Sequence, residues 1–364
     1  MGEVRSIAVL TSGGDAPGMN AAIRALAKLA AGRGIRVIGV ANGWEGAIDG
    51  RLRELTADAG DAGLTIPPEI DDLGALGGTV LGSARSMRFM KPEGRAEAAR
   101  RLEGIDGLVV IGGNGSLTGA HLLATEHGVR VLGIPASIDN DIGCTGMAIG
   151  VDTALNTIVE ACDRISDTAR AHRRAFVVEV MGRDCGYLAM ASAVAAGADA
   201  VLFREQNRSD EEVVSAVLEA VLRGFAPPRN KKRVLVIKAE GVELPATRLV
   251  RLLNERLETA LPGVEVRATV LGHLVRGGSP SYQDRMIAGR LAYAALDGLA
   301  AGATDEMAAW QPTVSGGTPT ADPSVQRFPL ERVLSETAAL LDGSSPVTRR
   351  RLALIEAVEG ILGL

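Results

Sequence analysis

The sequence has few aromatic residues and no excess of positive charge. Aromatic residues make up only 3% of the 364 residues, whereas hydrophobic residues make up 46%. The apolar residues are therefore mainly Ala, Val, Leu and Ile, the composition that buried parallel strands and their covering helices require. The formal net charge is −5, so the chain lacks the basic surface that nucleic-acid binding needs. We expect a small anionic ligand, bound by local arginines, in place of nucleic acid.

Cysteines are also few, and no long apolar run is present. Cys144, Cys162 and Cys185 match no metal-ligand spacing, and their odd number favours reduced, buried thiols in a cytoplasmic protein. The most apolar run, residues 187–203, is rich in Ala and Gly and contains Asp199. It predicts a buried helix followed by a strand better than a membrane span. The first residues show no signal segment, so we expect a cytoplasmic protein that does not enter a membrane.

Short apolar segments alternate with helical patterns along the chain. Repeated alternation of this kind indicates βαβ units, so the predicted fold class is α/β with mostly parallel sheets. The first sheet is expected within residues 1–150, and the long helix predicted from residue 151 opens a second one. The expected strands are 6–12, 36–42, 107–113, 131–137, 175–182, 200–205 and 233–241.

Polar residues gather where these strands end. Ligands of open parallel sheets bind beyond the carboxyl ends of the strands. We therefore expect a binding site built from the residues at these ends, which include Asp15, Asn114, Asp139, Arg183 and Glu240.

Two glycine-rich turns lead from a predicted strand into a helix. The first lies in TSGGDAPGMNAAIR and the second in GGNGSLTG. Glycine permits a positive φ and close backbone approach, and a helix N-terminus offers free N–H groups to an anion. The first turn lacks the P-loop pattern, and the second lacks the full dinucleotide spacing G-x-G-x-x-G. Either turn alone can be purely structural, but two in register favour phosphate binding.

A third motif, PASIDND, places Asp139 and Asp141 directly after a buried strand. Crowded carboxylates are costly unless a cation or a proton transfer uses them. One could take a proton from a substrate hydroxyl while the other orients it or holds a metal. The structural alternative is a helix cap followed by a turn, where Asp and Asn are common.

Several arginines lie beside glycines or at strand edges. Forked guanidinium groups bind phosphate in pairs, so together these arginines indicate a phosphorylated substrate. Any one of them alone is better explained as a solvated surface residue. They are Arg85, Arg88, Arg173, Arg174, Arg183, Arg267 and Arg276.

Taken together, the motifs resemble those of the bacterial 6-phosphofructokinase family, in order from residue 6 to about residue 300. The similarity rests on TSGGDAPGMNAAIR, GGTVLGSAR, GGNGS, IDND, GVDTALNTIVEACDRISDTARAH, VVEVMGRDCGYLA and RATVLGHLVRGGSP. The resemblance implies two Rossmann-like three-layer domains. It also implies transfer of a phosphoryl group from ATP, with Mg²⁺, to the 1-hydroxyl of fructose 6-phosphate in glycolysis.

The resemblance further implies how the chain is divided and assembled. Residues 1–150, with about 275–325, would form the nucleotide-binding domain. Residues 151–274, with the C-terminal tail, would form the sugar-phosphate-binding domain. The protein would be a cytoplasmic homo-oligomer, a tetramer or a dimer, with active sites shared between subunits.

Site roles are carried over by position. Asp139 resembles the general base that takes the hydroxyl proton, and Arg183 and Arg85 resemble the residues that bind the transferring phosphoryl group. The nucleotide phosphates would be bound by Gly14, Arg85, Ser86, Gly113, Asn114, Gly115 and Ser116. The sugar phosphate would be bound by Ser137, Asp139, Asp141, Arg174, Met181, Gly182, Arg183, Glu240, Arg267, His273 and Arg276, with Arg174 and Arg267 matching arginines that a neighbouring subunit supplies.

One departure from the family pattern, and the existence of pyrophosphate-dependent relatives, keep alternatives open. Where Asn114 stands, the family usually has an aspartate that holds Mg²⁺, so Asn114 would be a weak metal ligand and Asp141 a second candidate. This asparagine suits a catalytically weak regulatory paralogue. Pyrophosphate-dependent relatives typically have Asp at Gly115 and Lys at Ala136, and both residues are small here, which favours ATP. A dinucleotide oxidoreductase is the remaining alternative, but no hydride-transfer site is evident.

Regulation is not expected from the sequence. The effector pocket of the family's allosteric enzymes is basic, but Lys28 and Ser166 stand where arginines are usual. No role is assigned to the insertion at residues 56–72 or to the tail beyond about residue 340. The basic residues that could still serve an effector are Arg24, Arg51, Lys231 and Lys232.

Overall fold

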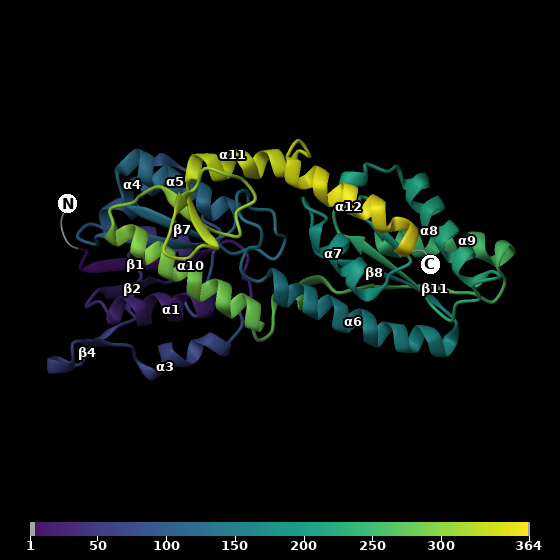
Figure 1. Cartoon of the computed structure of the whole chain (residues 1–364), viewed down its shortest axis with the longest axis horizontal. Helices are drawn as coiled ribbons and strands as arrows, with labels where there is room; N and C mark the ends of the chain where they lie inside the picture. Colours follow the sequence, from purple (N-terminus) through teal and green to yellow (C-terminus); the bar gives the residue numbers. More distant parts are fainter. Residues whose placement is uncertain (1–3, 363–364) are drawn as a thin grey trace. The chain divides into compact units, whose positions relative to one another are not determined.

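The computed structural model describes residues 4–362, and the chain divides into two compact units (Figure 1). The first unit contains the residues up to 138 together with 142–153 and 276–340. The second contains residues 139–141, 154–275 and those from 341 on. Each unit is built on a mainly parallel sheet, which confirms the predicted α/β class.

The sheet of the first unit has eight strands. They are β1 (Ser6–Ser12), β2 (Arg36–Val40), β3 (Leu52–Glu54), β6 (Gly107–Gly112), β7 (Val131–Pro135), β12 (Glu306–Trp310), β13 (Thr318–Pro319) and β14 (Val325–Pro329). Their order is β13-β14-β12-β7-β6-β1-β2-β3. The five strands from β12 to β2 run parallel, and β3, β14 and β13 add antiparallel edges. Every residue of β6 is buried, as expected for a strand covered on both faces.

β1 lies inside this sheet, and later strands of the chain are added on both sides of it. β1 pairs with β2 on one side, where Val9 lies opposite Gly39, and with β6 on the other, where Val9 lies opposite Val109. The strand order therefore reverses between β1 and β6. In open α/β sheets the crevice at such a reversal, at the carboxyl ends of the strands, is where ligands bind.

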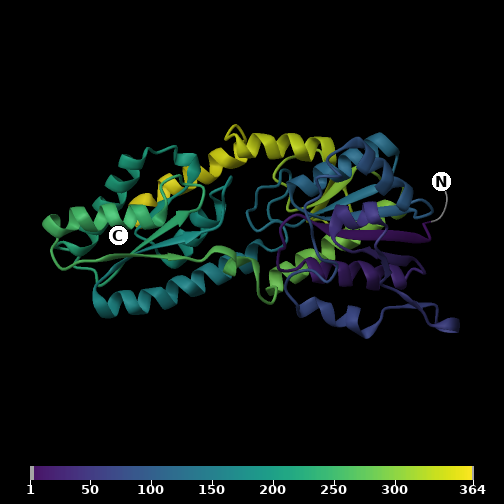
Figure 2. The same ribbon diagram turned by 180° about the vertical axis from the view of Figure 1, so that it is seen from behind.

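Helices cover both faces of the first sheet. Figures 1 and 2 show α1 (Met19–Ala31) and α10 (Tyr282–Ala300) on one face, with α4 (Pro92–Arg101) and α5 (Asn114–His127) on the other. α1 and α10 pack directly on each other, and α4 packs on both α2 (Gly43–Asp49) and α5. α11 (Leu330–Leu341) completes the unit. This is the three-layer arrangement that was expected.

The insertion at residues 56–72 forms a two-stranded hairpin and one short helix. The elements are β4 (Ala57–Asp58), β5 (Leu64–Thr65) and α3 (Pro68–Asp71). Asp71 accepts hydrogen bonds at Oδ1 from Arg24 Nη2 at 2.5 Å and from Lys28 Nζ at 3.2 Å. Arg24, a candidate for the effector pocket, and Lys28, which stands where an arginine is usual, thus share a carboxylate partner within the chain itself.

The second unit holds a four-stranded parallel sheet in the order β11-β8-β10-β9. The strands are β8 (Ala175–Val180), β9 (Ala200–Leu202), β10 (Val234–Ala239) and β11 (Val266–Val270). The helices are α6 (Val151–His172), which begins in the first unit, α7 (Tyr187–Ala196), α8 (Asp210–Phe225), α9 (Ala246–Ala260) and α12 (Pro346–Leu362). Apolar residues of α8 and α9, such as Val217 and Leu253, pack with Val177 and Val236 of the sheet. α7 and β9 confirm the buried helix and strand predicted for residues 187–203.

The cysteines and the helix lengths agree with the sequence analysis. Cys144, Cys162 and Cys185 are free and buried. Burial raises their thiol pKa values to about 12, 11 and 12, respectively. Within residues 4–362 no helix combines the length and the apolar character that crossing a membrane requires.

Asp284, on α10, is fully buried and caps the start of α6. Its carboxylate accepts hydrogen bonds from the backbone N–H groups of Gly150 and Thr153, both at 2.8 Å, and from the Thr153 hydroxyl at 2.5 Å. Burial raises the pKa of Asp284, and these hydrogen bonds oppose that shift. A helix start leaves N–H groups without intrahelical partners, so this side chain supplies a cap from a distant helix.

We expect Asp284→Ala to lower the stability of the first unit by about 2–4 kcal/mol, because two buried N–H groups lose their acceptor. The measurement is the midpoint of thermal unfolding, which should fall by several degrees. Asp297→Ala is the matched control, since Asp297 lies on the same helix, is 43% exposed and only approaches Arg33 at 3.7 Å. Equal midpoints for the two variants would contradict the capping role.

Candidate active site

The two glycine-rich turns meet at the carboxyl ends of β1 and β6. A side chain at Gly112 would meet the carbonyl oxygen of Ser12 at 2.5 Å and Ser116 Oγ at 2.6 Å. At Gly13, where φ is +87°, a Cβ would lie 3.2 Å from the same hydroxyl. Only glycine permits this close approach. The sequence prediction that the two turns act together is thus supported by direct contact at the reversal point of the sheet.

Ser116 is the polar group at the centre of this contact. Its hydroxyl is buried and has no hydrogen-bond partner among residues 4–362. It lies in the first turn of α5, which no side chain caps. Unpaired N–H groups at a helix start, together with an unsatisfied hydroxyl, suit the oxygens of a phosphate. Next to it, a side chain at Gly115 would meet nothing within 4 Å, so the space beside the turn is open.

Arg276 lies over the first turn. A Cβ at Gly14 would be 2.6 Å from Arg276 Nη1, and Arg276 donates a hydrogen bond to the carbonyl of Asp15 at 3.2 Å. The family resemblance groups Arg276 with the sugar-phosphate residues. In the structure this guanidinium belongs to the first unit and lies against the first glycine turn.

The segment that carries Arg85 and Ser86 is held beside the same turn. Ser83 donates to the carbonyl of Gly13 at 2.5 Å. Ser86 donates to Glu45, and this hydrogen bond, followed by that from Arg88, holds the pKa of Glu45 below its usual value. The Arg85 side chain is exposed. Glu45 could not be predicted from the sequence, because nothing near it in the chain indicates a contact with Ser86, 41 residues away.

The IDND motif contains a turn, and its residues Asp139–Asp141 belong to the second unit. No helix begins there, since α6 starts only at Val151; the helix-cap alternative for these residues is therefore wrong. Asn140 adopts a left-handed backbone with φ +50° and is 1% exposed. Its neighbours Asp139 and Asp141 are half-buried. Asn tolerates this conformation better than most residues, and the turn displays two carboxylates on either side of a buried residue.

Arg183 and Glu240 follow the adjacent strands β8 and β10. A side chain at Gly241 would lie 2.1 Å from the carbonyl oxygen of Arg183, so the two loops are packed backbone to backbone. Arg183 Nε lies 3.9 Å from Glu240, and the arginine side chain is 79% exposed. A guanidinium that is exposed and only loosely paired remains able to bind an anion.

A buried lysine fixes the loop that carries Glu240. Lys238 is 1% exposed, and its ammonium donates to Glu179 at 2.9 Å and to the carbonyls of Ala239 and Val242 at 3.2 and 3.1 Å. All three ammonium hydrogens therefore have acceptors, as a buried charge requires. The sequence predicted a strand here but gave no sign of the lysine's role, because its partner lies 59 residues earlier.

Other predicted sugar-phosphate residues also lie at the carboxyl end of the second sheet. Met181 is buried and directly follows β8. Gly182 has φ +119°, and a Cβ there would lie 2.6 Å from the carbonyl oxygen of Cys185. His273 follows β11 and is exposed. Ser137 belongs to the first unit, just before the turn that carries Asp139.

Arg174 and Arg267 come together on one carboxylate. Arg174 Nε lies 3.0 Å from Glu265, and Arg267 Nη2 lies 2.9 Å from it. The hydrogen bond from Arg267 is the main reason that the pKa of Glu265 is lowered. The side chains of Arg174 and Arg267 are 27% and 50% exposed. They therefore form one partly exposed cationic pair. Glu265, like Glu45 and Lys238, could not be predicted from a local sequence pattern.

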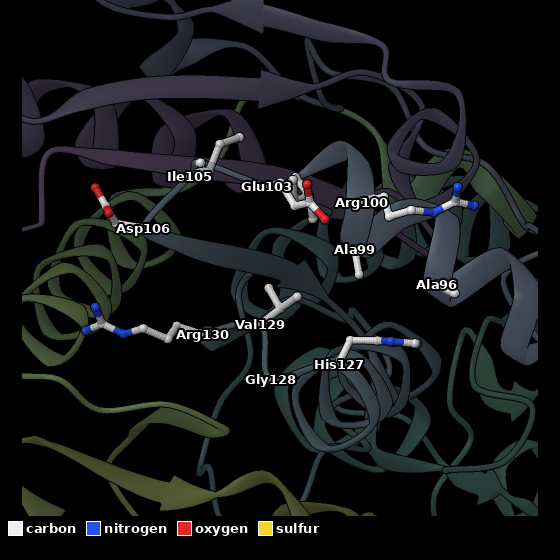
Figure 3. Close-up of a pocket in the computed structure, with 12 residues that line it drawn as sticks. Ala96, Ala99, Arg100, Glu103, Ile105, Asp106, His127, Gly128, Val129 and Arg130 are labelled. Atoms are coloured by element: carbon white, nitrogen blue, oxygen red, sulfur yellow. The ribbon is translucent and has the colours of Figure 1, made fainter.

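A hollow of about 470 Å³ lies elsewhere in the first unit (Figure 3). Its lining precedes β6 and β7 and includes Asp106, His127 and Arg130, so it lies at the amino ends of the strands. The last residues of α4 and α5 border it, and helix C-termini repel anions. This hollow is therefore not the predicted phosphate site.

The described part of the chain contains no cluster of three or more His, Cys, Asp or Glu that could hold a metal ion. Asn114, at the start of α5, is half-exposed and supplies one amide oxygen. Such a donor set suits Mg²⁺ that is held mainly by the phosphates of a nucleotide and its own water shell.

Two parallel α/β sheets, each with phosphate-suited residues at the carboxyl ends of its strands, define a phosphate-binding enzyme fold. The sequence pattern of the phosphofructokinase family matches residues 6–299. The chain is 42% identical to the ATP-dependent 6-phosphofructokinase of Thermotoga petrophila over 343 residues, covering 93% of this chain and 100% of that one. It is 44% identical to the ATP-dependent 6-phosphofructokinase 2 of Bacteroides thetaiotaomicron over 301 residues, covering 82% and 86%.

A solved structure of a phosphofructokinase also resembles this chain. The phosphofructokinase of Pichia pastoris in the T-state superposes with a TM-score of 0.84 at 30% identity, covering 99% of this chain and 39% of that longer chain. The chain belongs to the phosphofructokinase family. This confirms the resemblance on which the site residues were chosen, whereas their individual roles remain predictions.

Proposed function

We propose that this protein is an ATP-dependent 6-phosphofructokinase, which converts fructose 6-phosphate to fructose 1,6-bisphosphate in glycolysis. The observation that carries the proposal is the contact between the two glycine turns, with the unsatisfied hydroxyl of Ser116 at its centre. Family membership supplies the substrates. A cytoplasmic location follows from the same role.

The residues divide by unit. In the first unit, Gly14, Gly113, Asn114, Gly115 and Ser116 bind the phosphates of the donor, with Arg85 and Ser86 beside them. In the second, the sugar phosphate is bound by Met181, Gly182, Arg183, Glu240 and His273, together with Arg174 and Arg267. Asp139 and Asp141 of the second unit, with Ser137 and Arg276 of the first unit, complete the set of predicted sugar-phosphate residues.

The chemistry needs a base and charge neutralisation. Asp139 accepts the proton of the sugar's 1-hydroxyl, so that the oxygen attacks the terminal phosphorus of ATP. The bond from that phosphorus to the bridging oxygen breaks, and ADP leaves. Arg183 and Arg85 stabilise the charge that develops on the transferring group, and Asp141 orients the acceptor or its metal. Phosphoryl transfer depends mainly on positioning and electrostatics, which these residues can supply. Mg²⁺, when bound, neutralises the donor phosphates.

Two small residues favour ATP over pyrophosphate. A side chain at Gly115 would meet nothing within 4 Å, and Ala136, near Gly113, is itself a small residue. An Asp and a Lys at these positions would occupy the space that an α-phosphate needs. The chain therefore keeps room for a nucleotide.

One assay tests the function directly. Purified protein is given fructose 6-phosphate and Mg²⁺ with ATP or with pyrophosphate, in the forward and reverse directions. We expect turnover with ATP and little with pyrophosphate. Binding of fructose 6-phosphate without turnover on either donor would instead favour a regulatory paralogue.

Asn114 governs how much Mg²⁺ the reaction needs. We expect Asn114→Asp to lower the Mg²⁺ concentration for half-maximal rate several-fold, because a carboxylate adds one negative charge beside the ion. The rate at saturating Mg²⁺ should remain within an order of magnitude of the parent. The measurement is a Mg²⁺ titration of initial rates at fixed ATP. An unchanged titration would remove Asn114 from the metal's surroundings, and activity only in Asn114→Asp would support the regulatory paralogue.

We also propose that the active species is a closed homo-oligomer, a tetramer, in which Arg174 and Arg267 complete the site of a neighbouring subunit. Arg267→Ala and Asp139→Asn should each be nearly inactive. In randomly mixed oligomers about a quarter of the sites would carry neither lesion, so about a quarter of the parent activity should return. Mixing is verified by tagging one variant. Absence of recovery in verified hybrids would argue against shared sites.

A further inference from the structure

The C-terminal helix α12 presents three consecutive arginines, of which one faces inward. Arg349 and Arg350 are exposed, whereas Arg351 is half-buried. Thr348 and Ile355, spaced to share a helical face with Arg351, are 3% and 5% exposed. This face packs toward α7. The helix lies beyond residue 299, where the family match ends.

Arg351 donates to the carbonyl of Asn140. Its Nη1 and Nη2 atoms lie 3.3 and 3.2 Å from that oxygen. Asn140 is the buried, left-handed residue between Asp139 and Asp141. A left-handed backbone is less favourable than the right-handed form for a residue with a side chain, and a buried carbonyl needs a donor. Arg351 supplies two charge-assisted donors at this point.

The same guanidinium reaches a second loop. It stacks on the ring of Tyr187 at 4.4 Å and contacts Cys185 Sγ at 3.5 Å. Both residues belong to the loop and helix start that follow Arg183. Cys185 is 2% exposed, and burial raises its thiol pKa to about 12, so this contact is to a neutral group. The ring stacking and the carbonyl hydrogen bonds therefore fix the position of the guanidinium.

We propose that Arg351 is a positioning residue for phosphoryl transfer, which holds the Asp139–Asp141 turn against the loop that carries Arg183. The proposal rests on the proposed function, because it gives the two segments their catalytic roles. No role could be assigned to the C-terminal helix from the sequence. Through Arg351, this helix helps to hold the turn that carries the candidate base Asp139. All the residues involved lie in the second unit.

The test compares Arg351→Met with Arg350→Met in the full-length protein. Arg350 is the matched control, because it is exposed and its hydrogen bond within the described residues is to the carbonyl of Pro346 on its own helix. We expect Arg351→Met to lower kcat about 10- to 100-fold, the size of effect that a small misplacement of reacting groups produces. The KM for ATP should stay within about twofold, since ATP is assigned to the other unit. Arg350→Met should match the parent.

Two further measurements separate positioning from general loss of structure. Amide hydrogen exchange of a peptide covering residues 138–142 should quicken in Arg351→Met and not in Arg350→Met, while both thermal midpoints remain near the parent's. Guanidinium ion at about 20 mM should raise the kcat of Arg351→Ala several-fold and leave Asp139→Asn unchanged, since only the former lacks the donor. A kcat within twofold of the parent in Arg351→Met would overturn the proposal.

The remaining outcomes are also decisive. Should Arg351→Met fail to fold, Arg351→Lys takes its place, and a parental kcat there would overturn the proposal, because lysine supplies neither the fork nor the planar stack. If the parent itself has no turnover, the proposed function fails, and the exchange rate of residues 138–142 alone decides whether Arg351 holds the turn. Unchanged exchange would then reject the positioning role as well.

Discussion

Asp139→Asn is expected to lower kcat by about 10²- to 10⁴-fold, with little change in KM for either substrate. Asparagine has nearly the same shape as aspartate but cannot accept the hydroxyl proton. The fold of the turn should survive, because the buried Asn140 and its hydrogen bonds from Arg351 are untouched. The measurement is steady-state kinetics with ATP and fructose 6-phosphate at saturating Mg²⁺.

Two companion variants sharpen this experiment. Asp163→Asn, at an exposed position on α6, is the control for removing one negative charge from the second unit, and it should behave like the parent. Asp141→Asn shows which carboxylate is the base. A greater loss of kcat in Asp141→Asn than in Asp139→Asn would exchange their roles, and Asp139→Asn activity within threefold of the parent would remove Asp139 from the mechanism.

Arg183→Met should lower kcat by about 10²- to 10³-fold, because an arginine at the transferring phosphoryl group stabilises charge that develops only in the transition state. The side chain is 79% exposed and its pairing with Glu240 is as long as 3.9 Å. Its removal should therefore leave the thermal midpoint nearly unchanged. Kinetics and thermal unfolding are measured on the same preparation.

Arg204→Met is the control for Arg183→Met. Arg204 is also in the second unit and half-exposed, but it pairs tightly with Asp184 at 2.6 Å. Its loss should change neither kcat nor KM beyond about twofold, the scale of an exposed ion pair. Equal effects of the two substitutions would mean that Arg183 acts only through the general charge of the surface.

The central strands could be predicted from the sequence, because strands buried on both faces are continuous runs of aliphatic residues. β1, for instance, has the bounds Ser6–Ser12 that were predicted, and β8 and β10 are only a few residues shorter than expected. β12 and β14 were not predicted. The two strands pair with each other, but a long connection separates them in the sequence. β14 is antiparallel to β12, and the local sequence pattern does not reveal this partner.

Those parts of the candidate site that depend on a short sequence motif could be predicted. The glycine turns have such a pattern, because close approach of two backbones excludes every side chain. The supporting ionic contacts have none. Lys238 bonds Glu179 and Ser86 bonds Glu45, 59 and 41 residues away, and only the folded sheet brings them together. Likewise, the run Arg349–Arg351 does not reveal which arginine faces inward, since this depends on how α12 docks.

Each unit is assembled from separate segments of the sequence, and this affects how the protein folds during its synthesis. The first unit is complete only after residue 340. The second edge of β7 pairs with β12, which follows about 170 residues later in the sequence. At about 5–20 residues per second of synthesis, that edge stays open for roughly ten to thirty seconds on the ribosome. Neither unit can be finished by an emerging chain before the other has largely been made. Completion of the first sheet therefore depends on synthesis of β12. A chain that ended before β12 would expose an unpaired sheet edge to aggregation.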